Sequence, residues 1–285
     1  MQKEIIPKDI ELQIIEDYKS GCSVLSLSKK YGYKYHSTYS IIKKHNITIR
    51  GNDYTAKVFK NDSFVFDCID TEEKAYWLGF IYADGCIRKS GNNLKLSVAL
   101  AIQDKRHLEK LQSFLKTDAP VREYHNKNGR SYCRLSIIDR HMCEQLIQKG
   151  VYIRKTEIIT FPTFLDETLI RHFIRGYVDG DGSITFHKHN VNSNRLVYSL
   201  KITSTKEMLE SIHKYLPKNK ATDYPTFEKR RKNNVNNYSV SYGGNLQVLK
   251  MLDYLYADTT IYLDRKYERY LLLKSYYTKY SRLYW

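Results

Sequence analysis

Apolar side chains in the first 50 residues recur at the three- and four-residue spacing of short amphipathic helices. Gly21 and Ser23 separate the first helix from the second, and Gly32 turns the chain into a third helix over residues 35–45. The expected core positions are Ile10, Ile14, Ile15, Tyr18, Val24, Leu25, Leu27, Tyr31, Tyr39, Ile41 and Ile42. The pattern predicts a small all-α domain over residues 1–50.

From residue 71 the pattern alternates between helices and hairpins. A helix over residues 71–84 precedes strictly alternating apolar positions at residues 94, 96, 98, 100 and 102, which predict a strand with one buried face. Asp104 is expected to cap a helix to about Lys116, and a second hairpin turns at Asn128-Gly129. A helix over residues 139–149 ends this unit. The predicted order is helix, hairpin, helix, hairpin, helix.

The second half of the chain repeats this order. Helices are expected over residues 166–180 and 205–215, strands near residues 183–189, 195–202, 224–232 and 238–242, and helical segments from residue 245 onward. The sequence therefore predicts an α+β fold of two tandem αββαββα repeats, over residues 71–165 and 166–285. Residues 51–70 lack periodicity and are expected to be a linker, which either runs along a partner or is a loop packed by its phenylalanines.

Two nine-residue segments, about a hundred residues apart, read almost alike: Trp77–Gly85 (WLGFIYADG) and Ile174–Gly182 (IRGYVDGDG). Each predicts a helix that ends in an acid followed by glycine, and Gly85 and Gly182 suit left-handed caps. Small residues at helical spacing let another backbone approach closely, so the two helices are expected to pack on each other. The small positions are Gly79, Ala83, Gly176 and Gly180.

Asp84 and Asp181 are the informative residues of these segments. A carboxylate at a helix C-terminus faces the negative end of the helix dipole, which is unfavourable unless a cation is present. If the helices pack side by side, both carboxylates meet at one end and form a hard oxygen site for a divalent metal. Asp179 is out of helical alignment with Asp181 and is expected to face elsewhere. Taken alone, either segment also fits an ordinary Asp-Gly helix end.

With these two segments, residues 65–280 resemble the LAGLIDADG homing endonucleases. The sequence departs from the family pattern at Trp77, Tyr82, Arg175 and Tyr177, none of which is an acidic position. The resemblance implies two sheets that form a saddle related by a pseudo-twofold axis through the motif helices, in a monomer. It also implies metal-dependent cleavage (Mg²⁺ or Mn²⁺) of both DNA strands, with short 3′ overhangs. By the same resemblance Lys155 and Lys266, each after an arginine, are the catalytic lysines.

The chain's composition favours a polyanionic partner. The net charge is +16, from 47 basic and 31 acidic side chains, and no apolar run is long enough to span a membrane. The five cysteines are scattered, which indicates a reducing compartment and no zinc site. We expect double-stranded DNA as partner and a cytoplasmic protein of bacterial or phage origin. An intein is not expected, because the sequence starts at Met1 and ends without a His-Asn pair.

The third N-terminal helix resembles the recognition helix of helix-turn-helix domains. A helical bundle for protein contact is the other interpretation of this region. On the strands, side chains that alternate away from the core are the expected contacts with bases and phosphates. The DNA-contact candidates are His36, Ser37, Thr38, Lys43 and Lys44 on the helix, and Arg130, Tyr132, Arg134, Arg195, Lys201, Lys229 and Arg231 on the strands.

The resemblance predicts a monomeric, site-specific homing endonuclease that makes double-strand breaks in a long DNA target. Two further interpretations stay open at this point. One is a DNA-binding regulator on the same scaffold without catalysis, although such proteins usually lose the acids. The other is an intron maturase, because a basic saddle can also hold a folded RNA.

Overall fold

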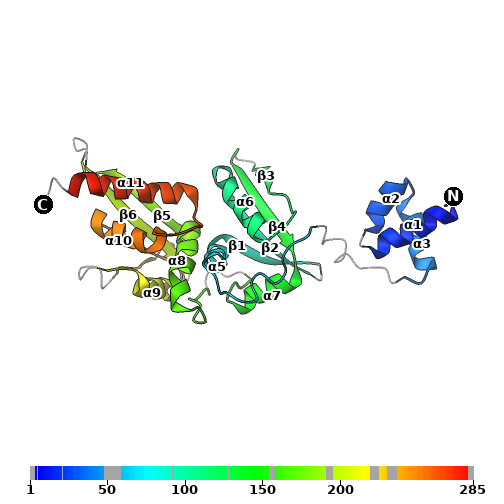
Figure 1. The fold of residues 1–285 in the computed structure, drawn as a ribbon, viewed down its shortest axis with the longest axis horizontal. Coiled ribbons are helices and arrows are strands. Elements are labelled where there is room, and N and C mark those ends of the chain that lie inside the picture. Colours follow the sequence, from blue (N-terminus) through cyan, green and yellow to red (C-terminus); the bar gives the residue numbers. More distant parts are fainter. Residues whose placement is uncertain are drawn as a thin grey trace. The chain divides into compact units, whose positions relative to one another are not determined.

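The structure is a computed structural model that describes residues 4, 6–20, 22–47, 59–91, 93–126, 129–153, 158–190, 195–218, 225–229 and 236–281. The chain divides into two compact units, which are described separately (Figure 1). Unit 1 comprises Met1–Phe59 with the hairpin turn Lys89–Asn93, and unit 2 comprises Lys60–Arg88 with Leu94–Trp285. No helix in the described ranges combines the length and apolar character needed to cross a membrane.

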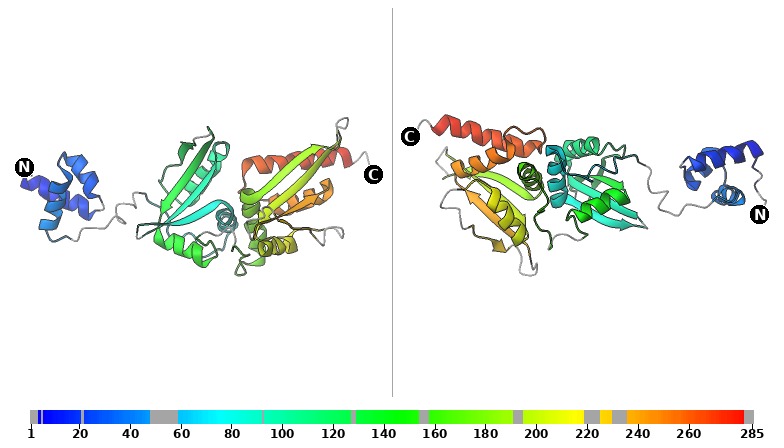
Figure 2. Two further views of the ribbon diagram at one scale, coloured as in Figure 1. Left: turned by 180° about the vertical axis from the view of Figure 1, so that it is seen from behind. Right: turned by 60° about the horizontal axis from the view of Figure 1, so that its bottom comes forward.

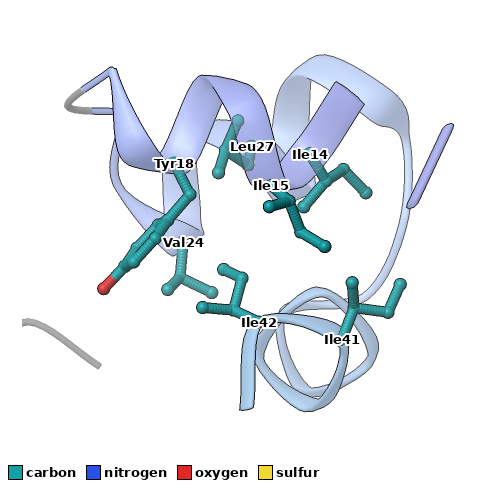
Figure 3. Packing of buried hydrophobic residues seen from close by; sticks show 7 residues of the cluster. All are labelled: Ile14, Ile15, Tyr18, Val24, Leu27, Ile41 and Ile42. Carbon is teal, nitrogen blue, oxygen red and sulfur yellow. The ribbon is translucent and has the colours of Figure 1, made fainter. Parts of the chain in front are cut away.

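The described part of unit 1 contains the expected helices, α1 (Lys8–Lys19), α2 (Val24–Tyr31) and α3 (Tyr35–Lys44). The Ser23 hydroxyl accepts a hydrogen bond from the Ser26 N–H at 3.0 Å, and Gly32 takes the left-handed conformation (φ 74°) that ends α2. The core predicted from the apolar spacing is largely confirmed (Figure 3), except that Leu25 is 54% exposed. Its buried members are Ile14, Ile15, Tyr18, Val24, Leu27, Ile41 and Ile42.

The first repeat in unit 2 begins with α5 (Glu72–Asp84), followed by β1 (Gly85–Ser90), β2 (Asn93–Ala101), the short 3₁₀ helix η1 (Ile102–Asp104), α6 (Lys105–Phe114), β3 (Arg122–His125), β4 (Ser131–Ile138) and α7 (Arg140–Gln148). Its strands form an antiparallel sheet in the order β1-β2-β4-β3. Two expectations were wrong here. Ile102 is partly exposed in η1, outside the strand, and Asp104 makes no side-chain cap, because its carboxylate instead accepts from Arg265 Nε at 3.0 Å.

The second repeat has the same order: α8 (Glu167–Asp181), β5 (Gly182–Lys188), β6 (Leu196–Ser204), α9 (Lys206–Tyr215), β7 (Glu228–Lys229), β8 (Tyr238–Gly243), α10 (Asn245–Tyr256) and α11 (Asp264–Ser281). Its sheet order, β5-β6-β8-β7, matches that of the first repeat. The predicted α+β duplication is therefore confirmed. Helices start where expected, because Asp139, Asp166 and Thr205 each accept a hydrogen bond from a backbone N–H of the first turn.

Each sheet in unit 2 has one face covered by helices. In Figure 1, α6 lies over the first sheet and α10 and α11 lie over the second, and from behind the strands themselves face the viewer (Figure 2, left). The apolar strand positions, such as Leu96, Val98, Leu135, Leu200 and Ile202, are buried under the helices. The opposite faces of both sheets are seen in the same view and are called the open faces. Between the sheets, α5 and α8 lie side by side.

The glycines after the two motif acids were expected in left-handed caps, and this was wrong. Gly85 (φ −73°, ψ 147°) and Gly182 (φ −90°, ψ 160°) have extended backbones that any residue adopts. Glycine is required at both positions for a steric reason. A Cβ at Gly85 would lie 2.6 Å from the carbonyl oxygen of Ile81, and one at Gly182 would overlap the carbonyl oxygen of Val178. Glycine is needed here because the chain turns tightly from helix into strand.

The segment predicted as a linker is only partly described, since residues 51–58 lie outside the described ranges. From Lys60 onward the segment belongs to unit 2. Phe66 is buried against Phe114, with ring centroids 5.7 Å apart, and the Asp62 N–H donates to the Leu115 carbonyl. Residues 60–70 therefore form a loop packed by aromatic side chains, which is one of the two interpretations given above.

Candidate active site and nucleic-acid interface

The motif helices α5 and α8 pack through their glycines. A Cβ at Gly79 would overlap the carbonyl oxygen of Phe173, and one at Gly176 would overlap the carbonyl oxygen of Tyr76. At Gly180 an added Cβ would overlap the Cβ of Ala83. Each of these atoms belongs to the other helix, so the backbones touch where side chains are missing. This contact fixes the position of each helix along the axis of the other.

The packing places the two acids at one end of the helix pair. Asp84 and Asp181 are the last residues of α5 and α8. The Oδ2 atom of Asp84 lies 3.2 Å from where a Cβ would stand at Gly180, so this carboxylate lies against the last turn of α8. Both carboxylates also act electrostatically on the Tyr177 hydroxyl and on the Lys266 ammonium. Asp84 is half-buried and Asp181 is exposed.

The donor set at this end suits a hard divalent cation. Asp84 and Asp181 supply carboxylate oxygens, which Mg²⁺ and Mn²⁺ prefer. No group of three or more His, Cys, Asp or Glu side chains gathers in the described ranges. A Mg²⁺ ion usually takes only one or two protein carboxylates and completes its shell with water and phosphate oxygens. The two acids therefore fit such an ion, with the remaining ligands left for water and a phosphodiester.

Lys266 lies beneath the end of α8 with only 1% of its surface exposed. Its Nζ donates hydrogen bonds to the carbonyl oxygens of Val178 at 2.6 Å, Asp179 at 2.7 Å and Gly182 at 2.6 Å. Burial lowers the pKa of Lys266 to about 8, and the nearby carboxylates act in the opposite direction. Lys155, the lysine expected to match it in the first repeat, lies outside the described residues.

Asp179 faces away from the two motif acids. Its carboxylate accepts hydrogen bonds from the hydroxyls of Tyr76 at 2.7 Å and Tyr256 at 2.5 Å, and from the N–H of Leu263 at 2.8 Å. Burial raises the pKa of Asp179. This side chain connects both motif helices to the loop before α11, which is a structural role.

Arg175 is a residue whose importance the sequence analysis missed. Its guanidinium is fully buried and donates to the carboxylate of Glu72 at 2.8 Å, and to the carbonyls of Leu255 at 3.1 Å and Ile261 at 3.0 Å. The signal in the sequence was a single arginine among the apolar and small residues of the second motif segment. The guanidinium ties α8 to the start of α5 and to the segment that leads to Lys266.

The open face of the first sheet is basic and aromatic. Residues directly opposite each other on antiparallel strands share a face, so the pairs Tyr124–Tyr132 and Arg122–Arg134 lie together on it. The two tyrosine rings stack with centroids 5.2 Å apart, and the Arg134 guanidinium lies 5.3–5.4 Å from both centroids. Alternation adds Arg88 and Lys95 to this face. Among the described strand residues of this face there is no acid.

The open face of the second sheet is poor in charge. Lys201 lies there, 3.6 Å from Glu228. Most of its other described positions are hydroxyl side chains: Ser183, Thr185, Ser199, Thr203, Ser239 and Ser241. Lys229 was expected on this face, and this was wrong. It pairs with Tyr238 in the register, which places it on the same face as Val240, the helix-covered side. Arg231 lies outside the described residues.

Two other candidates are placed at strand ends. Arg130 is exposed in the turn before β4, where its N–H donates to Asn126 Oδ1 at 2.9 Å. Arg195 is exposed just before β6, and its carbonyl accepts from the His189 N–H at 2.8 Å.

In unit 1, the face of α3 opposite the core carries most of the predicted contact residues. His36, Lys43 and Lys44 are exposed, and Lys44 lies 3.0 Å from a carboxylate oxygen of Glu11. Thr38 was expected outside, and this was wrong: it is fully buried against the other helices of the bundle. Ser37 is half-buried.

Two αββαββα units joined through a pair of motif helices define a duplicated fold with its acids at the helix junction. Residues 71–148 match the family model of the LAGLIDADG-like domain, so this part of the chain carries that domain, and the resemblance inferred from the sequence is confirmed over these residues. A second, partial likeness is to the DNA-directed RNA polymerase subunit Rpo1C of Methanocaldococcus jannaschii, 29% identical over 140 residues. The alignment covers 48% of this chain and spans only 15% of the length of that protein.

Solved structures of LAGLIDADG enzymes are similar at low sequence identity. The I-LtrWI homing endonuclease bound to target DNA is 13% identical, with 73% of this chain and 92% of that chain covered and a TM-score of 0.47. The meganuclease I-SmaMI bound to uncleavable DNA is 15% identical, with 72% and 90% covered and a TM-score of 0.49. The homing endonuclease I-GzeII in complex with its DNA target is 13% identical, with 73% and 90% covered and a TM-score of 0.48.

Proposed function

We propose that this protein is a divalent-metal-dependent DNA endonuclease that cuts both strands of a long, specific site and acts as a monomer. The observation that carries this proposal is the meeting of Asp84 and Asp181 at one end of a glycine-packed helix pair. A bound divalent ion would supply a polarised water and charge neutralisation at the phosphodiester. The two acids, one from each repeat, would hold this ion. The two strands of the duplex would then meet equivalent parts of the site.

The open faces of the sheets are the proposed DNA-binding surface. Arg134 and Arg122 present guanidinium groups that can bind guanine through two hydrogen bonds, and Lys95 and Arg88 can bind phosphates. In the second repeat Lys201, with the surrounding hydroxyls, is the proposed contact. We also propose that residues 1–50 form a separate DNA-binding domain that lengthens the footprint through His36, Lys43 and Lys44. Cleavage across the minor groove with short 3′ overhangs completes the proposal.

The decisive experiment is a cleavage selection. The protein is incubated with Mg²⁺ and a library of long duplexes, and cut molecules are captured and sequenced at their ends. We expect one preferred site with short 3′ overhangs and no cutting when EDTA is present. Folded protein that cuts no member of the library with Mg²⁺ or Mn²⁺ would contradict the enzyme proposal and favour a DNA-binding regulator.

The site residues are tested by isosteric amides. Asp84→Asn and Asp181→Asn each remove one carboxylate while they keep the side-chain shape, so double-strand cutting should fall by about a thousandfold or more, in line with loss of a group that stabilises the transition state. Affinity for the selected duplex without metal should change by less than about threefold. Normal cutting by either variant would show that the ligand assignment is wrong. Asp253→Asn, on α10, is the matched control.

A further inference from the structure

The ammonium of Lys266 has no donor left for chemistry. An ammonium has three N–H groups, and three carbonyl oxygens, those of Val178, Asp179 and Gly182, lie 2.6–2.7 Å from Nζ. The carbonyl of Gly180 is a fourth, weaker neighbour at 3.5 Å. Together with its burial, this geometry leaves no N–H directed at the exposed side of Asp181.

The same three hydrogen bonds hold the backbone before and after Asp181. Val178 and Asp179 precede Asp181 in the last turn of α8, and Gly182 follows it as the first residue of β5. The last carbonyls of a helix have no partner within the helix, and a cation there also offsets the negative end of the dipole. The Asp179 carbonyl is such a group, whereas the Val178 carbonyl also accepts the N–H of Gly182. By binding all three carbonyls, Lys266 joins the last turn of α8 to the first residue of β5, so it fixes the backbone that carries Asp181.

Lys266 is itself held in place by neighbours from both repeats. The N–H of Leu263 donates to the Asp179 carboxylate, and Arg265 Nε lies 3.0 Å from both carboxylate oxygens of Asp104, in the first repeat. The residues just before the lysine are therefore anchored to both repeats. The ammonium position is set by the fold, independently of any ligand.

We propose that Lys266 is a positioning residue, which holds the end of α8 so that Asp181 can bind metal, and that it is not a catalytic residue that touches the attacking water or the phosphate. This inference rests on the proposed endonuclease function for its metal-binding part. Its structural part, the fixation of the residues around Asp181, stands without that function. The family resemblance alone had placed this lysine in the chemistry.

The test compares Lys266→Met with Lys274→Met. Methionine keeps the length of the side chain and removes its donors, and Lys274 is an exposed lysine two turns further along α11. In metal-free protein we expect backbone amides of residues 182–184 to exchange with deuterium at least tenfold faster in Lys266→Met. The Lys274→Met variant should exchange like the unmodified protein.

The second measurement is metal binding to the protein–DNA complex. With Ca²⁺ as the probe in calorimetry, we expect the affinity to fall tenfold or more in Lys266→Met, while metal-free affinity for the duplex is unchanged. Cutting by this variant should recover as Mg²⁺ is raised, because the variant has lost metal binding and kept the chemistry. Unchanged amide exchange and Ca²⁺ affinity, with slow cutting at saturating Mg²⁺, would overturn the inference and place Lys266 in the reaction.

A third variant keeps the test decisive if Lys266→Met does not fold. Lys266→Gln retains two N–H donors without the charge, and its amide exchange should be intermediate between the unmodified protein and a protein without the bonds. Exchange and Ca²⁺ affinity equal to the unmodified protein would contradict the inference. If the unmodified protein neither binds Ca²⁺ nor cuts DNA, the endonuclease proposal fails, but faster exchange in the variants still supports the positioning role.

Discussion

The two repeats of unit 2 share one fold but differ on their open faces. The first presents Arg88, Lys95, Arg122 and Arg134 with two stacked tyrosines, and the second presents a row of hydroxyls with Lys201 beside Glu228. The strand orders are the same, and the helices follow the same order except for the additional α11 of the second repeat. Duplication has therefore kept the parts that make the fold, while the surfaces free of packing have diverged.

The two open faces would contribute in different ways to DNA binding. A basic, aromatic face attracts phosphates strongly and in a salt-dependent way, and its Arg134 guanidinium is already oriented by the two tyrosine rings. A hydroxyl-rich face contributes shorter-range hydrogen bonds and little charge. We infer that the first repeat supplies more of the affinity and that the second supplies contacts that depend on close fit. A single chain with unlike halves can thus recognise an asymmetric site.

The interiors differ as well, for example in the helix that follows the first hairpin of each repeat. His107 is the third residue of α6 and is buried, and the third residue of α9 is the buried Met208. His107 Nε2 lies 3.0 Å from the Tyr76 hydroxyl, which donates to Asp179. The first repeat therefore contains a buried titratable group at a position where the second has an apolar one.

The largest expected effect is on the packing of the two motif helices, a feature to which both repeats contribute. Gly79→Ala and Gly176→Ala each place a Cβ against a backbone carbonyl of the other motif helix, which cannot move without separating the helices. Each should lower the free energy of unfolding by about 3 kcal/mol or more, measured by urea unfolding. Gly243→Ala, where an added Cβ meets nothing within 4 Å, is the control and should cost little. A loss below about 1 kcal/mol in both motif variants would contradict the packing.

The second effect is the contribution of the buried His107, in the first repeat, to the pH dependence of stability. Burial lowers the pKa of His107 to about 3, whereas an unfolded histidine titrates near 6.5. As the pH falls below 6.5, the unfolded chain takes up a proton that the folded chain does not, so stability decreases. This group alone should remove about 2 kcal/mol of stability between pH 6.5 and 4.5.

The matched variant for this effect is His107→Met, which copies the second repeat. Urea unfolding at a series of pH values should show a shallower acid dependence in the variant, by about 2 kcal/mol over that window. His125→Gln, at an exposed position of the edge strand β3, is the control variant. Parallel curves for His107→Met and the unmodified protein would show that His107 is not responsible.

The third effect separates the two open faces. Arg134→Ala removes an oriented guanidinium, so affinity for the selected duplex should fall tenfold or more, which is about 1.4 kcal/mol. Lys201→Ala should reduce it less than about threefold, because Glu228 already offsets that charge. Fluorescence anisotropy titrations at one fixed salt concentration measure both. Equal losses for the two variants would contradict the inferred division between the repeats.

The smallest expected effect is a gain in DNA affinity. Glu228→Gln removes the acid beside Lys201 and should raise DNA affinity about two- to threefold at low salt, with the gain lost as salt screens the exposed charges. The same anisotropy titration at several salt concentrations measures it. Glu123→Gln, an exposed acid of β3 beside Lys105, is the matched control from the first repeat, off its open face. Reduced affinity for Glu228→Gln at low salt would indicate that Glu228 itself contacts the DNA.

Some features of this protein follow from the sequence alone. Helix and strand periodicities, the break between helices at Gly21 and Ser23, and the two motif segments are local signals, because they depend on residues a few positions apart. They were enough to predict the duplicated α+β fold and to single out Asp84 and Asp181. The buried strand positions Leu96 and Val98 were predicted from alternation for the same reason.

Other features were decided only by the tertiary structure. The face of Lys229 depends on its register with β8, and the burial of Thr38 depends on how three helices meet. Lys266 could be placed in the chemistry by resemblance, but only the folded chain brings it under three carbonyls more than 80 residues away. These roles arise from contacts between segments distant in sequence, where local propensity carries no information about the partner. The same physical reason explains why the role of Arg175 was missed.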